Sequence, residues 1–186
     1  MKAKASIITK YDEADSSGKV DLIIRHYPNF LGIVDGFTEG LCYVIENEKS
    51  YNRKASHGDL GVRVQSSGQH SDITAYTAVE NVITIEAIIT CDFSDGILDD
   101  VDRGPEFQKE AFILRDMRKH YALFNKQLGI LSNEENKFFL GYLSKEQNLG
   151  DLADEAGIQY ESAGQKLRRI KKKIKIQMIG FLDGQI

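Results

Sequence analysis

The chain has 186 residues, of which 41% are hydrophobic and 28% are charged, and its formal net charge is −4 at pH 7. This length and apolar content allow one domain or two small ones with a buried core. No apolar run approaches the roughly eighteen residues of a membrane span. The N-terminal stretch also lacks the continuous apolar run of a signal peptide. We therefore expect a cytoplasmic protein with no membrane partner.

Positive charge is concentrated near the C-terminus. Of the ten residues from Lys166 to Lys175, seven are Lys or Arg. Subtracting these seven from the 24 basic residues leaves 17 against 28 acidic ones, so the rest of the chain has a formal charge of −11. Such a balance argues against a nucleic-acid coat protein and indicates a single basic face.

The N-terminal part has a helical pattern. After the turn signal DSSGK at 15–19, apolar residues recur every three or four positions over 20–47, and Pro28 divides this region into a short and a longer helix. The polar segment 50–72 predicts a mobile linker. Its basic residues Arg53, Lys54, His57 and Arg63 leave open a second, weaker DNA contact or a surface that orders on a partner.

The middle of the chain predicts two more helices around a loop. Residues 72–91 are rich in Ile, Val and Thr, which favour strands, but the polar positions Glu80 and Glu86 fit one side of a helix and no partner strand is visible elsewhere. The acidic stretch DFSDGILDDVDRG follows as a solvated loop. Gly104-Pro105 then opens a long helix with proline in its first turn, and this helix ends near Gly129.

Residue types for catalysis or metal binding are not grouped in this sequence. The aspartates of DFSDGILDDVDRG lack the spacing of an EF-hand loop, and the four histidines are scattered. Cys42 and Cys91 lie far apart in apolar surroundings, which predicts buried thiols. No nucleophile motif or glycine-rich phosphate loop is present. We therefore expect no enzyme, no metal and no cofactor.

The C-terminal part predicts three consecutive helices. Ser132 and Glu135 have capping-box spacing and begin the first helix; LGDLADEAG forms a short second helix that ends at Gly157, where a left-handed turn is expected. The third helix follows Ile158. Small or apolar residues supply the core between these helices, namely Leu152, Ala153, Ala156, Ile158, Ala163, Leu167, Ile170 and Ile174.

These residues carry a family resemblance. The LA-x-x-x-GI core from Leu152 to Ile158, the small residue Ala163 and the LRRI-x-x-K run resemble the helix-turn-helix of sigma-factor region four and of LuxR-type regulators. A protein of this size with such a C-terminal module resembles phage and mobile-element regulators of the ArpU and RinA types. Two residues depart from the pattern: Gln159 stands where Ser or Thr usually caps the third helix, and Gly164 weakens its first turn by roughly 1 kcal/mol.

The resemblance implies a transcription regulator whose third helix enters the major groove of double-stranded DNA. Gln165 would pair with adenine, and Arg168 or Arg169 with guanine. The lysines further along would contact phosphates. The implied DNA-binding residues are Gln159, Tyr160, Glu161, Ser162, Gln165, Lys166, Arg168, Arg169, Lys171, Lys172 and Lys173.

Other interpretations remain open. A basic helix face is often only solvated surface, and Leu167, Ile170, Ile174, Met178 and Phe181 would then be a packing stripe. The apolar C-terminal end either packs on the long helix from Pro105 or pairs with a second copy as a homodimer. A sigma-like factor would also bind RNA polymerase core. An antagonist of sigma factor or polymerase would bind protein and not DNA.

The expected fold is therefore all-α, with six or seven helices. An N-terminal helical domain at 1–103, containing the linker 50–72, would precede a C-terminal helix-turn-helix domain at 104–186.

Overall fold

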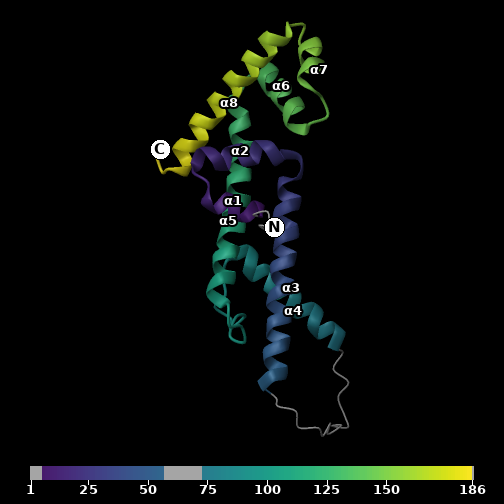
Figure 1. The fold of residues 1–186 in the computed structure, drawn as a ribbon, viewed down its shortest axis with the longest axis vertical. Coiled ribbons are helices and arrows are strands. Elements are labelled where there is room, and N and C mark those ends of the chain that lie inside the picture. Colours follow the sequence, from purple (N-terminus) through teal and green to yellow (C-terminus); the bar gives the residue numbers. More distant parts are fainter. Residues whose placement is uncertain (1–5, 57–72, 186) are drawn as a thin grey trace, which may run out of the picture. The chain divides into compact units, whose positions relative to one another are not determined.

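The structure of the protein is a computed structural model that describes residues 6–56 and 73–185 (Figure 1). Every element in these two ranges is a helix, so the all-α expectation is confirmed. None of these helices has the length and apolar character needed to cross a bilayer. The elements are α1 (Ile7–Glu13), α2 (Ser16–His26), η1 (Tyr27–Asn29), α3 (Phe30–Ser56), α4 (Ile73–Thr90), α5 (Gly104–Gln127), η2 (Leu128–Ile130), α6 (Asn133–Ser144), α7 (Leu149–Glu155) and α8 (Tyr160–Leu182).

Local sequence signals explain most helix boundaries. The predicted break at Pro28 is the short 3-10 helix η1, which has proline in its first turn. The helix α4 forms despite its β-branched residues, as expected from its pattern. The unpredicted helix is α1, where the Ser6 hydroxyl accepts a hydrogen bond from the Thr9 amide and caps the first turn.

The helix α3 is longer than the sequence indicated. It continues through Ser56, so the expectation that a linker begins at residue 50 is wrong. Contacts with distant residues hold this extension: Asn52 donates to the Asp100 carbonyl at 2.9 Å, and Arg53 pairs with Asp100 at 3.0 Å. The remainder of the expected linker, 57–72 with His57 and Arg63, lies outside the described residues.

The chain forms two compact units. One consists of Met1–Ile33 with Met117–Ile186, and the other of Val34–Asp116. Because the first unit joins N-terminal and C-terminal residues, the expected division into 1–103 and 104–186 is not confirmed.

An aromatic cluster forms the centre of the first unit. The Phe30 and Tyr121 rings stack with centroids 5.4 Å apart, and the Tyr11 ring lies 6.1 Å from that of Phe30. The polar edges of this cluster are satisfied, since the Tyr27 hydroxyl donates to Asn125 at 2.7 Å. These contacts join α1, η1 and α3 to the second half of α5.

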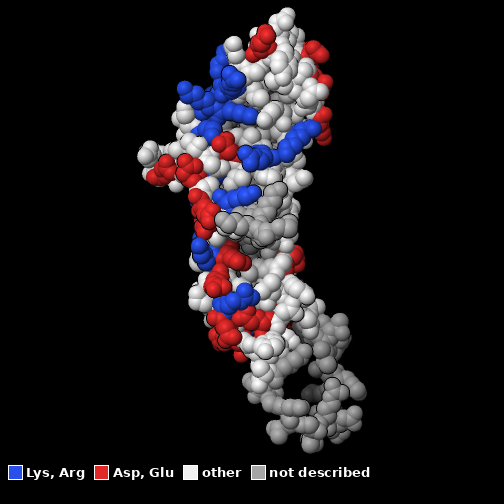
Figure 2. All heavy atoms as spheres, in the orientation of Figure 1, with Lys and Arg blue, Asp and Glu red and all other residues white. Residues whose placement is uncertain are grey.

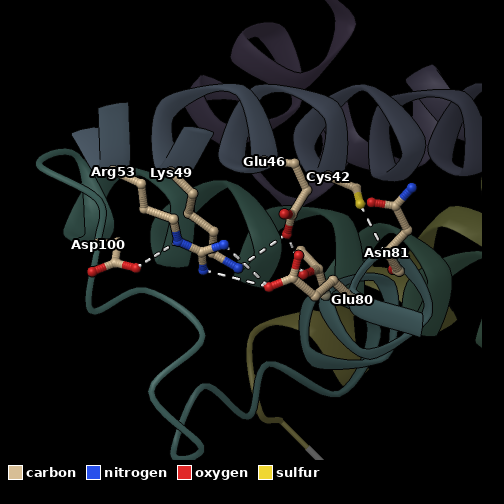
Figure 3. A network of polar contacts seen from close by, with 8 residues as sticks. Cys42, Glu46, Lys49, Arg53, Glu80, Asn81 and Asp100 are labelled. Carbon is tan, nitrogen blue, oxygen red and sulfur yellow. Dashed lines mark hydrogen bonds and ion pairs between the residues drawn. The ribbon is translucent and has the colours of Figure 1, made fainter. Parts of the chain in front are cut away.

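A polar network lies between α3 and α4 in the second unit (Figure 3). Glu46 accepts from Lys49 at 3.0 Å and from Thr84 at 2.7 Å. Arg53 pairs with Glu80 at 3.3 Å as well as with Asp100. Because each of these side chains has a partner of opposite charge or a hydrogen bond, the half-buried polar groups between the helices are satisfied.

The two cysteines differ in burial and form no disulfide. Cys42 is buried as expected, and burial, with the neighbouring carboxylates Glu46 and Glu39, raises its pKa to about 11. Cys91 is only partly buried, contrary to the expectation, because it ends α4 in a left-handed conformation at φ 57°. With a pKa of about 11, the Cys42 thiol stays protonated at neutral pH and is a poor nucleophile.

Candidate nucleic-acid interface

The helix α6 begins and ends with clear local signals. Its predicted capping box is present: the Glu135 amide donates to the Ser132 hydroxyl at 3.2 Å, and the Ser132 amide donates to the Glu135 carboxylate at 3.1 Å. Lys145 ends the helix at φ 59°, in the left-handed conformation that glycine or asparagine usually adopts. The boundary at Ser132 follows from local sequence, whereas a lysine at the other end is unexpected.

A second capping box starts α7. The Asn148 side chain accepts from the Gly150 and Asp151 amides, and the Asp151 carboxylate accepts from the Asn148 amide at 2.9 Å. The helices α6 and α7 approach closely at Gly141, where a Cβ atom would lie 2.8 Å from the Leu152 methyl group. The sequence did not indicate this contact, which favours glycine at that position.

The turn between α7 and α8 matches the sequence prediction in its backbone. Gly157 has φ 63°, and the Ile158 amide donates to the Ala153 carbonyl at 3.0 Å. Leu152 and Ala153 are buried, but Ala156 is exposed, so its expected place in the core is wrong. The reason is that Ala156 is the C-cap of α7, where the chain already turns outward.

One face of α8 packs on α2, α6 and α7. The buried residues are Ala163, Leu167, Ile170, Ile174 and Met178. Phe181, expected in the same stripe, is 38% exposed. The end of α8 is bonded to α2, since Ser16 donates to Asp183 and Lys175 pairs with Asp21 at 2.7 Å. Figure 1 shows this end of α8 beside α2. The apolar C-terminal end therefore rests on α2, which neither interpretation of the sequence anticipated.

The residues implied by the resemblance lie on or beside the outward face of α8. Nine are exposed: Gln159, Tyr160, Glu161, Ser162, Gln165, Arg168, Arg169, Lys172 and Lys173. A helix advances about 100° per residue, so residues spaced by four, three and four share one line. Glu161, Gln165, Arg168 and Lys172 form this line, opposite the buried stripe. Figure 2 shows Lys and Arg gathered over this part of the molecule.

Several cations of the basic stretch are held by neighbouring helices. Lys166 lies 5.0 Å from the Phe138 ring centre, and Lys171 donates to the Tyr142 hydroxyl at 2.8 Å. Lys173 pairs with Glu135 at 3.3 Å. These lysines therefore also fasten α8 to α6, a role that the sequence did not indicate.

Glu135 connects the cap of α6 to α8. Its pKa is lowered by the hydrogen bond from the Ser132 amide first, and then by the hydrogen bond and charge of Lys173. The ionised form of this carboxylate therefore stabilises the α6–α8 contact.

Three cations are available for a partner. Within the described ranges, Arg168, Arg169 and Lys172 make no side-chain hydrogen bond or ion pair, and all three are exposed. Such groups bind an anionic ligand without first breaking a contact within the protein.

The start of α8 lacks a side-chain cap. Gln159 is its N-cap residue and makes no capping hydrogen bond. At Gly164 an added Cβ would make only an ordinary contact, 3.9 Å from the Leu149 methyl group. The free amides of the first turn therefore have no side-chain cap from Gln159.

No group of three or more His, Cys, Asp or Glu side chains within 6–56 and 73–185 has an arrangement that would hold a metal ion. Comparison of the chain with protein-family models, with curated proteins and with solved structures finds no match.

Proposed function

We propose that the protein is a sequence-specific DNA-binding transcription regulator of the phage or mobile-element type, with α8 as its recognition helix. The observation that carries the proposal is the outward line of Glu161, Gln165, Arg168 and Lys172 on a helix whose opposite face is buried. A helix held in this way presents a fixed set of polar side chains to the major groove.

The outward residues have different roles in the proposal. Gln165 would read adenine and Arg168 would read guanine, since their side chains match the hydrogen-bonding edges of these bases. Lys172 lies one further turn along and would contact a phosphate. Glu161, at the start of the same line, repels phosphates and would limit how deeply α8 enters the groove, or would accept from cytosine.

The salt dependence of DNA affinity tests the proposal. The full chain is required because α2 packs on α8, so a fragment that starts at residue 104 would expose an apolar face. With about four or five phosphates engaged, log affinity should fall with log salt with a slope near −4. Negligible binding to a random pool of duplexes, even at low salt, would refute the proposal.

Two variants separate sequence reading from general attraction. Arg168→Ala should relax the preference at one base pair, at about 1–3 kcal/mol. Lys172→Glu should weaken binding to all sequences alike. Lys172 is a cleaner choice than Lys171 or Lys173, because reversing either of those charges would also disturb α6. If Arg168→Ala weakens every sequence equally, the assignment of that residue to base reading is wrong.

The exposed face of α4 supports an additional protein partner. Val79 is 57% and Val82 is 64% exposed, and Ile83 and Ile89 are also exposed. One line of α4 residues has the alternating four- and three-residue spacing of a helix-pairing seam: Ala75, Val79, Val82, Glu86 and Ile89. An exposed apolar seam of this kind marks a binding surface.

We propose that a second copy of the chain covers this seam. Glu86 is the only charged residue of the seam. The nearby Glu80 is paired with Arg53. Two copies would therefore meet at this seam without strong repulsion, although the protein as a whole is acidic. An antiparallel pair centred on Val82 would place Glu86 opposite Ala78 of the other copy. A parallel pair would instead place the two Glu86 carboxylates together. A twofold dimer would carry two recognition helices to two half-sites.

Sedimentation of the full chain tests the dimer. Val82→Asp should shift it to monomer, whereas Glu86→Gln should have little effect on an antiparallel pair and should stabilise a parallel one. Wild-type protein that stays monomeric at high micromolar concentration would refute the proposed dimer.

A monomeric protein would favour the alternative function, an antagonist of sigma factor or RNA polymerase. Strong binding to polymerase core without DNA affinity would select that alternative, and co-purification with core together with DNA binding would select a sigma-like factor.

A further inference from the structure

A cavity of about 470 Å³ lies beside α8, between α2 and the turn that joins α6 to α7. Its polar lining comes from three parts of the chain that are distant in sequence. Arg25 and Asp21 belong to α2, Lys145 ends α6, and Lys171 belongs to α8. All of these elements belong to the same compact unit.

The lining has an excess of positive charge. Arg25 and Lys145 are exposed, and no side-chain hydrogen bond or ion pair links either of them to another described residue. Lys171 donates only to the neutral Tyr142 hydroxyl. The one carboxylate in the lining, Asp21, is paired with Lys175. The lining therefore has three cations and one carboxylate, and that carboxylate is paired with Lys175, which does not line the cavity.

The neighbouring His26 lies close to two of these cations. Its pKa is lowered by burial first, and then by the charges of Lys145, Arg25 and Lys10. The field of the cavity lining therefore extends to a side chain that does not line it.

The conformation of Lys145 adds a separate observation. This lysine has φ 59° and ψ 14°, a left-handed conformation that is strained for residues with a Cβ atom. Glycine or asparagine would end α6 there with less strain. Lys145 is thus both strained and part of the cavity lining, and backbone strain of this kind is common at binding sites.

We propose that this cavity binds a phosphate group through Arg25, Lys145 and Lys171. Tyr142 belongs to the same lining, and its hydroxyl, which accepts from Lys171, would donate its own proton to the phosphate. Resting on the proposed function, the phosphate is one of the DNA backbone. Lys171 follows the base-reading residues Gln165 and Arg168 along α8. Because Arg25 of α2 lines the same cavity as Lys171, α2 would extend the DNA contact beyond the helix-turn-helix.

The test measures duplex-DNA affinity of the full chain against salt. Each lost phosphate contact should make the slope less steep by about 0.9 and weaken binding about fivefold at physiological salt. We expect this for Arg25→Gln and for Lys145→Gly, and the latter also relieves the strained conformation, so folding is not at risk. Lys119→Gln, an exposed lysine outside the cavity lining, is the matched control and should change neither quantity.

A variant that should bind DNA more tightly tests whether the positive charge of the cavity lining attracts the phosphate. Asp21→Asn removes the only carboxylate of the lining and releases Lys175, so the slope should steepen and binding should tighten several-fold. A role of Asp21 in folding alone would weaken binding or leave it unchanged.

The outcomes separate this proposal from the proposed function. If the wild-type protein binds DNA and the cavity variants behave like Lys119→Gln, the phosphate site is wrong and the regulator stands. If the wild-type protein binds no DNA, titration with inorganic phosphate decides. Amide NMR shifts confined to Arg25, Lys145 and Lys171, and lost in Lys145→Gly, would support a site for a free phosphate ester. Absence of these shifts would overturn the site as well.

Discussion

Replacing either of two helical glycines by alanine should have different effects on stability. Each replacement gains roughly 1 kcal/mol from helix propensity. At Gly164 the new Cβ would lie 3.9 Å from the nearest atom, the Leu149 methyl group, so the gain should remain. At Gly141 it would lie 2.5 Å from Gln147 Oε1, at the end of a side chain that can rotate away, and 2.8 Å from a methyl group of Leu152, which is only 2% exposed.

The size of the difference follows from the cost of overpacking. Forcing an extra carbon into a packed contact costs about 1–3 kcal/mol, so Gly141→Ala should be unchanged to about 2 kcal/mol less stable. For a protein of this length, 1 kcal/mol corresponds to about 2–4 °C in Tm. Gly164→Ala should therefore melt a few degrees above the wild type, and Gly141→Ala at or below it.

Thermal melts followed by circular dichroism measure both variants against the wild type. Gly129→Ala, with nothing within 4 Å of its added Cβ, controls for a general effect of removing glycine. Equal stabilisation by Gly141→Ala and Gly164→Ala would mean that α6 and α7 do not approach closely at Gly141. The packing that positions α8 would then be wrong.

Three further predictions concern single side chains. Gln159→Ser should supply the missing cap of α8 and raise stability by roughly 1 kcal/mol in a denaturant titration; no change would argue against an uncapped first turn. Cys42 should react slowly with iodoacetamide at pH 7–8 and faster as pH approaches its pKa of about 11, and rapid labelling at pH 7 in the folded protein would contradict its burial. Because the pKa of Glu135 is lowered in the folded protein, its contribution to stability is complete above the ordinary glutamate pKa and is lost as pH falls through the lowered value. Glu135→Gln should remove that part of the pH dependence, and identical acid melts of the two proteins would refute the linkage.

The sequence alone determined the features that depend on near neighbours. The capping box of Ser132 and Glu135, the break at Pro28 and the left-handed Gly157 involve residues within a few positions of each other, so local pattern was sufficient. Seven helices follow from such signals. Short α1 was missed because its cap at Ser6 precedes the first turn signal that the sequence offered.

Only the tertiary structure decided which residues of the basic stretch are available. The composition of Lys166 to Lys175 is the same whether its side chains face water, α2 or α6. Pairing with Glu135, Tyr142 and Asp21 depends on helices up to 154 positions away in sequence. The same reason explains why α3 continues past residue 50 and why the N-terminal α2 covers the C-terminal α8. These arrangements depend on charges and apolar faces that meet only after the chain has folded.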